Sequence, residues 1–143
     1  MIPMTISKLL SANDTGDTGG HQAGILVPKD EAILAFFPKI DRTIHNPRSH
    51  LLFLDNDGKE WEFAFIYYNN RLFGGTRNEF RLTRMTKFIR GAGLVPGDEI
   101  LLTRSEDGDY SIGIRRQKQS TAQRDSEGRT VLQLGSGWRV VQR

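Results

Sequence analysis

Cysteine is absent from this sequence of 143 residues, and histidine is scarce, with three residues. Without cysteine the chain forms no disulfide framework and no thiolate metal site. The histidines, at positions 21, 45 and 50, lack the His-x-x-x-His spacing of a helical zinc site, so we expect no bound metal. No apolar run approaches 18 residues, and the first residues lack the pattern of a secretory signal. We therefore expect a cytoplasmic protein with no membrane partner.

The motifs of common catalytic sites are also missing. The sequence contains no Gly-x-Ser-x-Gly and no P-loop. Asp57-Gly58-Lys59 matches one piece of a metal-dependent nuclease motif, but it follows Asp55 in a predicted hairpin turn, where Asp-Gly is common. We expect no catalytic activity in this chain. A nuclease built on Asp55, Asp57 and Lys59 stays open as an alternative.

The net charge of +3 conceals an uneven distribution. Residues 1–70 carry a charge of −3, residues 71–90 carry +5, and residues 91–143 carry +1. Five of the six cations in residues 71–90 are arginines, and Glu79 is the one acid among them. Arginine presents a planar fork that matches phosphates and guanine edges. A local basic stripe is typical of a polyanion site, and a solvated basic face is the alternative.

Short β-prone runs separated by turn signals dominate the chain. Strands are expected at residues 5–10, 23–27, 51–54, 61–68, 79–84, 99–104, 110–115, 131–134 and 138–142. Two short helices are expected at 29–37 and 86–90, and the segments 11–22, 38–50 and 69–78 are expected to be irregular. The aromatic positions 63, 65 and 67 alternate as the core face of a strand does. This pattern predicts a mainly β fold, a sandwich or a barrel.

Two polar loops carry the side chains that hydrogen-bond to base edges. Arginine pairs with guanine, asparagine or glutamine with adenine, and a carboxylate with the cytosine amino group. Arg77, Glu79 and Arg81 alternate, so they share one face of an extended segment. Three such residues fit successive bases in a major groove, whereas a plain surface ion pair of Glu79 with a neighbouring arginine is the alternative.

The same two loops make the sequence recognisable. Residues 10–22 (LSANDTGDTGGHQ), followed by AGILVP at 23–28, closely resemble the N-terminal effector-binding domain of EcoRII-like type II restriction endonucleases. Residues 67–84 (YYNNRLFGGTRNEFRLTR) resemble the second recognition segment of that family. The resemblance implies a DNA-binding pseudobarrel, a seven-stranded open β-barrel with two short helices, similar to the plant B-three domain.

The resemblance also implies how such a domain works. Two arms, here residues 11–22 and 74–81, grip the major groove of double-stranded DNA at a short near-palindromic site of the CC-(A/T)-GG kind. We expect base contacts from Asp14, His21, Arg77, Asn78, Glu79 and Arg81. Contacts to the DNA backbone or roles within the arms are expected for Asn13, Thr15, Thr18, Gln22, Asn70, Arg71, Thr76, Arg84 and Lys87.

The family resemblance extends to the rest of the protein. In that family a separate C-terminal nuclease domain cleaves the DNA, and magnesium is expected only there, with no cofactor needed for DNA binding. We expect residues 1–143 to form one monomeric DNA-binding domain of a bacterial cytoplasmic protein, with a flexible loop at 118–128 and the nuclease domain outside this chain. The alternatives are a stand-alone transcriptional regulator of B-three type and, from the aromatic residues, a single-strand binder.

Overall fold

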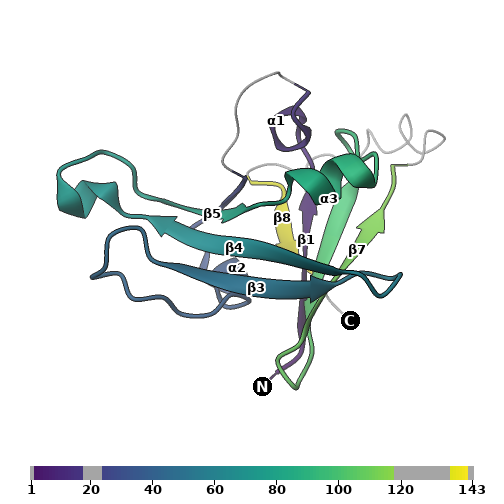
Figure 1. Cartoon of the computed structure of the whole chain (residues 1–143), viewed down its shortest axis with the longest axis horizontal. Helices are drawn as coiled ribbons and strands as arrows, with labels where there is room; N and C mark the ends of the chain where they lie inside the picture. The colour runs from purple at the N-terminus through teal and green to yellow at the C-terminus, as the bar shows by residue number, and fades with distance from the viewer. Residues whose placement is uncertain (1, 18–23, 118–135, 142–143) are drawn as a thin grey trace.

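In the described part of the chain, a single sheet of eight strands forms the body of the molecule (Figure 1). The computed structural model describes residues 2–17, 24–117 and 136–141. The strands are β1 (Met4–Leu9), β2 (Ile25–Val27), β3 (Arg48–Leu54), β4 (Glu60–Tyr68), β5 (Glu79–Thr83), β6 (Glu99–Arg104), β7 (Tyr110–Arg115) and β8 (Trp138–Val140). Three short α-helices and one 3-10 helix join them: α1 (Ala12–Thr15), α2 (Glu31–Leu34), η1 (Asn70–Phe73) and α3 (Thr86–Gly91).

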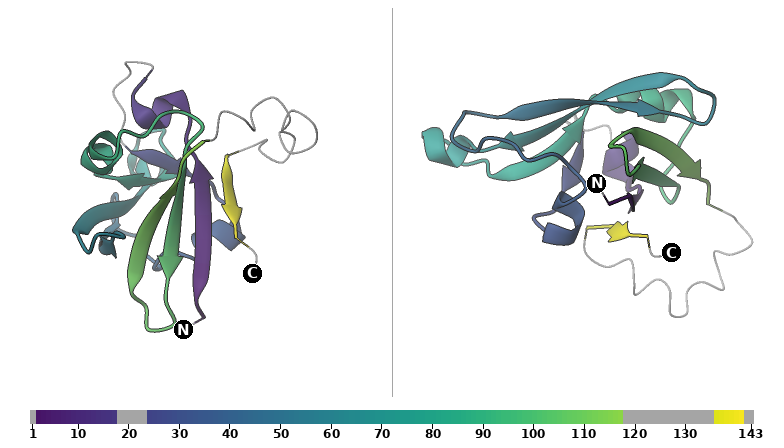
Figure 2. Two further views of the ribbon diagram at one scale, coloured as in Figure 1. Left: turned by 90° about the vertical axis from the view of Figure 1, so that its right-hand side faces the viewer. Right: turned by 90° about the horizontal axis from the view of Figure 1, so that it is seen from below.

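The strand order is β2-β5-β4-β3-β7-β6-β1-β8. All neighbours pair antiparallel except β3 and β7, which meet in parallel over two residue pairs. Figure 2 shows β7, β6, β1 and β8 side by side as one wall of the molecule. The two edge strands are tied together, because the Trp138 indole nitrogen on β8 donates to the Leu26 carbonyl of β2 over 2.9 Å. The sheet therefore curls into a nearly closed barrel.

Alternation along the strands fills the barrel. Phe63, Phe65 and Tyr67 on β4 and Phe80 and Leu82 on β5 are all less than 9% exposed. Phe37 stacks on Phe65 with ring centroids 4.2 Å apart, and Phe80 stacks on Tyr67 at 4.3 Å. The prediction that positions 63, 65 and 67 face the core is confirmed, so these rings are not a stacking platform for single strands. Residues 79 and 81 of β5 consequently face outward.

The mainly β pseudobarrel is confirmed, with corrections to its parts. The described residues contain eight strands rather than seven, and three α-helices and a 3-10 helix rather than two helices. β3 begins at Arg48, inside a segment predicted to be irregular, because it pairs with β4 as far as Ile66. The predicted strand at 131–134 and the flexible loop at 118–128 lie outside the described residues. None of the described helices is long and apolar enough to span a membrane.

Gly24 is required at the start of β2. Its φ of +87° lies in the left-handed region, and a Cβ atom there would lie 2.2 Å from the Leu82 carbonyl oxygen of β5. Only glycine allows the backbone to approach β5 this closely while turning into β2. This close approach holds the start of β2 against the β5 backbone, where Ile25 pairs with Leu82.

Candidate nucleic-acid interface

The first arm begins with a capped turn of helix. Ser11 is the N-cap of α1: its hydroxyl accepts from the Asp14 amide at 3.2 Å, and the Asp14 carboxylate accepts from the Ser11 amide at 3.0 Å. The same carboxylate lies 3.0 Å from the Lys8 ammonium of β1, and both side chains are less than 10% exposed. Gly16 ends the helix in the left-handed region at a φ of 85°. The capping box and the ion pair with Lys8 thus fix α1 to the barrel.

The β4–β5 loop, residues 69–78, leads into the second arm (residues 74–81) and extends beyond the ends of β4 and β5, at the far left of Figure 1. Within it, η1 turns back on itself: the Arg71 amide donates to the Arg77 carbonyl at 3.0 Å, and the Gly75 amide donates to the Asn70 carbonyl at 2.7 Å. Gly74 ends η1 at a φ of 92°. These bonds close the β4–β5 loop, and Arg71, Leu72 and Phe73 are exposed within it.

Asn69 anchors the second arm to the segment that precedes β3. The residue is buried, and its side-chain amide nitrogen donates to the carbonyls of Arg42 at 3.0 Å and Ile44 at 2.8 Å. Its amide oxygen accepts from the Asn46 backbone at 2.7 Å. Next to it, Asn70 bonds the His45 ring at 2.9 Å. A buried, satisfied amide of this kind holds one geometry, so the arm has a rigid base.

The outer face of β5 carries three linked charges. Arg77 Nη2 and Arg81 Nε both donate to Glu79 Oε2, at 2.9 and 2.5 Å, which leaves Oε1 outside these two bonds. Arg81 Nη1 also donates to the Gly24 carbonyl at 3.1 Å. The side chains of Arg77, Glu79 and Arg81 are 40%, 29% and 20% exposed, so all three reach solvent. Arg77, Glu79 and Arg81 share one face, as the sequence predicted. Glu79 also forms the ion pairs that were given as the alternative to base contact.

The Glu79 carboxylate stays ionised because of the arginines beside it. Burial raises the pKa of Glu79, but the hydrogen bonds from Arg81 and Arg77 and their positive charges outweigh burial, and the pKa lies below its ordinary value. Glu79 is therefore an acceptor at neutral pH.

A shallow hollow of about 330 Å³ connects the two arms. Arg81 lines one side, and Asn13 and Asp14 of α1 line the other. The remaining wall comes from Lys8, Ser11, Leu26, Pro28 and Ser136. Residues nearly 70 positions apart in the sequence thus face one surface depression on the outside of the barrel.

The predicted backbone-contacting cations lie outside the lining of this hollow. Arg84 directly follows β5, with an unusual φ of 68°, and Lys87 lies on α3, which contacts α1. Arg84, Lys87 and Arg71 are all exposed. These positions suit contacts with a polyanion that lies across β5 between the arms.

Not every predicted residue is equally free to contact a ligand. Asn78 accepts a short hydrogen bond from the Tyr67 hydroxyl, and Thr15 donates to the Asp17 carboxylate at 2.7 Å. Asp14 is mostly buried in the capping box, so base contact by Asp14 stays a prediction that requires these bonds to rearrange. Thr76 is exposed. Thr18, His21 and Gln22 lie outside the described residues.

Sequence reasoning missed the residues that hold the arms. Lys8 lies in a strand pattern that gives no hint of a buried cation, and Asn69 lies in a loop of polar residues. Tyr68, whose ring lies under Arg77, directly follows the alternating core positions 63, 65 and 67, and no role was predicted for it from the sequence. Only the capping box had a sequence signal, Ser11 followed three residues later by an acid.

The alternative nuclease residues are engaged in a turn. Asp55 Oδ1 accepts from the amides of Asp57 and Lys59, each at 2.9 Å, and Oδ2 accepts from the Trp61 indole at 2.9 Å. The Trp61 and Lys59 bonds lower the pKa of the Asp55 carboxyl below its ordinary value, with a smaller opposing effect of burial. In the part of the chain that the structure describes, no three His, Asp or Glu side chains form a metal-binding group.

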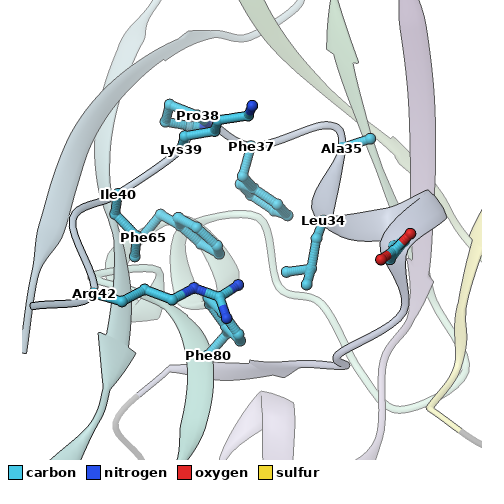
Figure 3. Close-up of a pocket in the computed structure, with 10 residues that line it drawn as sticks. Leu34, Ala35, Phe37, Pro38, Lys39, Ile40, Arg42, Phe65 and Phe80 are labelled. Atoms are coloured by element: carbon cyan, nitrogen blue, oxygen red, sulfur yellow. The ribbon is translucent and has the colours of Figure 1, made fainter.

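A larger hollow of about 670 Å³ opens on the opposite, inner side of β4 and β5 (Figure 3). Phe37, Phe65 and Phe80 line it, and the Arg42 guanidinium lies 5.3 Å from the ring centres of both Tyr67 and Phe80. The three rings of its lining are each less than 5% exposed. This hollow is the mouth of the barrel core and contains none of the predicted DNA-contacting residues.

Comparison with known proteins adds a family model and several relatives. Residues 3–93 match the model described as "Restriction endonuclease EcoRII, N-terminal". The type II restriction enzyme EcoRII of Escherichia coli is 48% identical over 80 residues, which are 54% of this chain and 20% of that enzyme. Auxin response factor 2 of Oryza sativa subsp. japonica is 36% identical over 118 residues, 82% of this chain and 15% of that protein. The chain thus spans a fifth or less of the length of these relatives.

Two solved structures share the fold. The Arabidopsis FUS3–DNA complex aligns with a TM-score of 0.61 and 22% identity over 78% of this chain and 96% of that chain. The B3 (B-three) domain of the UbaLAI restriction endonuclease, solved with cognate DNA, aligns with a TM-score of 0.57 and 23% identity over 96% of this chain and 86% of that chain. Both likenesses agree with the predicted pseudobarrel.

Proposed function

The chain belongs to the family of N-terminal domains of restriction endonuclease EcoRII, and from that premise we propose that it binds double-stranded DNA sequence-specifically. The two arms, residues 11–22 and 74–81, enter the major groove. The target is a short near-palindromic site of the CC-(A/T)-GG kind. The family predicted from the two loop sequences is confirmed.

The array of Arg77, Glu79 and Arg81 carries the proposal. Its hydrogen bonds to Glu79 and Gly24 hold the two guanidinium groups side by side at the surface. Each arginine keeps further N–H donors, because a guanidinium has five. Glu79 Oε1 is available to accept from a cytosine amino group, while the arginines address guanines. An acid held in the middle of a basic surface favours base recognition over general phosphate attraction.

The flanking cations supply affinity rather than selectivity. Arg71 lies in η1, Arg84 directly follows β5, and Lys87 lies on α3, which contacts α1. Neutralising phosphates releases counterions, so affinity depends steeply on salt. Asn13, Asn70 and Thr76 contact the DNA backbone or support the arms. We place Thr18, His21 and Gln22 in the first arm on the family resemblance.

The full-length protein is proposed to be a type II site-specific deoxyribonuclease of the bacterial cytoplasm. In this proposal a C-terminal nuclease domain, outside the present chain, performs the magnesium-dependent cleavage. The present residues bind the effector or target site and hydrolyse nothing. The isolated domain is monomeric and needs no cofactor.

Enrichment from randomised duplexes tests the proposal. The protein is incubated with a pool of duplexes carrying a random core, and the bound fraction is sequenced over several rounds. We expect one short near-palindromic site to dominate, and its affinity to exceed that of random duplex by about 1,000-fold or more. A pool that stays random would overturn the proposal.

A stand-alone regulator of B-three type is the second candidate. The auxin response factors favour it, because the match to one of them covers 82% of this chain. Both candidates bind duplex DNA, and the coding sequence downstream of residue 143 distinguishes them by the presence of a nuclease domain. Either of two results would overturn both candidate functions. One is tighter binding of single strands than of duplex, and the other is magnesium-dependent nicking of plasmid by the present chain that Asp57→Asn abolishes.

A further inference from the structure

Tyr68 lies directly beneath one of the proposed base-contacting arginines. The guanidinium carbon of Arg77 is 3.9 Å from the centre of the Tyr68 ring. Tyr68 is the last residue of β4 and pairs across the sheet with Glu79, so ring and carboxylate share the outer face. Tyr67, one residue earlier, faces the core instead, with its hydroxyl bonded to Asn78. Two adjacent tyrosines therefore have different environments.

The ring and the carboxylate fix different features of the Arg77 side chain. Stacking on an aromatic face sets the plane of a guanidinium, since the attraction acts on the face of the ring. The bond from Nη2 to Glu79 Oε2, at 2.9 Å, sets which edge of that plane points along the strand. With plane and edge both fixed, the remaining N–H groups point in one direction. The contact with Glu79 uses one of the five N–H donors and leaves a fork for a base.

We propose that Tyr68 is a positioning residue that holds Arg77 ready to contact one base before DNA arrives. The proposal rests on the proposed function and adds a residue and a role to it. A free arginine loses much side-chain freedom when it is fixed in a complex. Because the Tyr68 ring already restricts the Arg77 side chain, DNA binding loses less conformational entropy. The resulting gain in affinity applies only to duplexes that Arg77 contacts. Tyr68 therefore acts on selectivity at one base pair rather than on general attraction to DNA.

The chemistry of the ring suggests a matched set of variants. The Tyr68 hydroxyl makes no hydrogen bond within the part of the chain that the structure describes, so Tyr68→Phe keeps the interaction. Tyr68→Trp strengthens it, because indole is the best partner for a cation. Tyr68→Leu keeps an apolar side chain at the strand end and removes the ring.

Affinities of the variants are measured by fluorescence anisotropy with the enriched duplex and with random duplex. We expect Tyr68→Leu to weaken binding of the enriched duplex by about 2- to 30-fold, the range for a cation–π contact, and random duplex by less than about twofold. We expect Tyr68→Phe to bind both duplexes with the affinity of the wild type. In an Arg77→Ala background, Tyr68→Leu has less than about a twofold effect, since its partner is gone.

The outcomes separate the two claims. If the wild-type protein binds enriched and random duplexes equally, the proposed function fails and the role of Tyr68 with it. If the wild type discriminates but Tyr68→Leu weakens both duplexes alike, or keeps its full effect in the Arg77→Ala background, the positioning role is overturned and the proposed function stands.

An NMR measurement tests the contact without any variant. A ring at 3.9 Å shifts the side-chain protons of Arg77 upfield in the protein without DNA, relative to Arg71, which is exposed and has no such ring contact among the described residues. Absence of the shift would overturn the proposal even if Tyr68→Leu failed to fold.

Discussion

One oxygen atom, Oε2 of Glu79, holds two arginine side chains on the outer face of β5. Such surface ion pairs contribute little to stability, usually less than about 1 kcal/mol. Their effect is geometric, because they fix the directions of two cations and leave one carboxylate oxygen available. At the residue scale, the two bonds that form the ion pair also hold the proposed base-contacting array in one geometry before DNA is present.

Replacement of Arg77 tests this arrangement. We expect Arg77→Ala to weaken binding of the enriched site by about 1–3 kcal/mol and to relax selectivity at one base pair. The measurement is anisotropy with duplexes altered at single positions. Arg115→Ala is the control, because Arg115 is an exposed arginine that also pairs with a glutamate, Glu99, but lies on β7 away from the arms. An equal loss on enriched and random duplexes would contradict base contact by Arg77.

The pKa of Glu79 predicts a pH dependence of stability. Because the folded protein holds this pKa below its ordinary value, ionised Glu79 stabilises the fold above that ordinary value. The stabilisation is lost as the pH falls through the depressed pKa. We expect the difference in free energy of unfolding between wild type and Glu79→Gln, measured with urea, to shrink from pH 7 to pH 3. Asp41 and Asp55, whose pKa values are also lowered, titrate equally in both proteins. If the difference between wild type and Glu79→Gln grew as the pH fell, the lowered pKa of Glu79 would be contradicted.

At the scale of single elements, each arm depends on contacts that hold a short segment in place. α1 has four residues, too few to be stable in isolation, and the capping box and Lys8 compensate. The sequence segment 11–22 is rich in glycine and polar residues, which is why it predicted a loop. Ser11-x-x-Asp14 resembles the spacing of a capping box, but no apolar stripe follows it, and so no helix was predicted there.

Asp14 tests the anchoring of the first arm. We expect Asp14→Ala to destabilise the protein by about 1–3 kcal/mol, because it removes the carboxylate half of the capping box and leaves the buried Lys8 ammonium without its charge partner. Asp17→Ala removes the same charge from an exposed position two residues after α1 and is expected to cost less than about 0.5 kcal/mol. Urea denaturation compares them. If both variants lost the same free energy of unfolding, the effect would come from the change in net charge and not from the contacts of Asp14.

Gly24 and Gly58 form a matched pair for the β2–β5 contact. Both have a φ above +80°, but a Cβ at Gly24 would overlap the Leu82 carbonyl, whereas at Gly58 nothing lies within 4 Å. Gly58→Ala therefore measures backbone strain alone, about 1–3 kcal/mol. Gly24→Ala is expected to cost clearly more in thermal unfolding and to weaken DNA binding, since Arg81 bonds the Gly24 carbonyl. Similar melting temperatures for the two variants would contradict the close approach.

At the scale of the whole molecule, most of the barrel could be predicted and its closure could not. Alternation in residues 61–68 predicted β4 and its core face, because every second side chain of a strand points to the same side of the sheet. Closure depends on the bond between Trp138 and the Leu26 carbonyl, more than 100 residues apart, for which local sequence holds no signal. The start of β3 at Arg48 was missed for the same reason: pairing with β4, not local propensity, makes it a strand.

The candidate site was predictable where residue type alone determines chemistry. The basic stripe and the alternation of Arg77, Glu79 and Arg81 are visible in the sequence and indicate the outer face of β5. The supporting residues Lys8, Tyr68 and Asn69 were not predictable, because no sequence pattern marks their contacts with Asp14, with Arg77 and with residues 42–46. Arms that lie nearly 70 residues apart meet at one hollow only after the barrel has formed.

The central claim is that this fold recognises a short duplex sequence through the array on β5. The most direct test is a set of duplexes in which the enriched site is changed one base pair at a time, with affinity measured at two salt concentrations. We predict losses of about 1–3 kcal/mol confined to a short block of base pairs, superimposed on a steep salt dependence common to all duplexes. A flat profile, with every duplex bound alike and only salt altering affinity, would contradict the account.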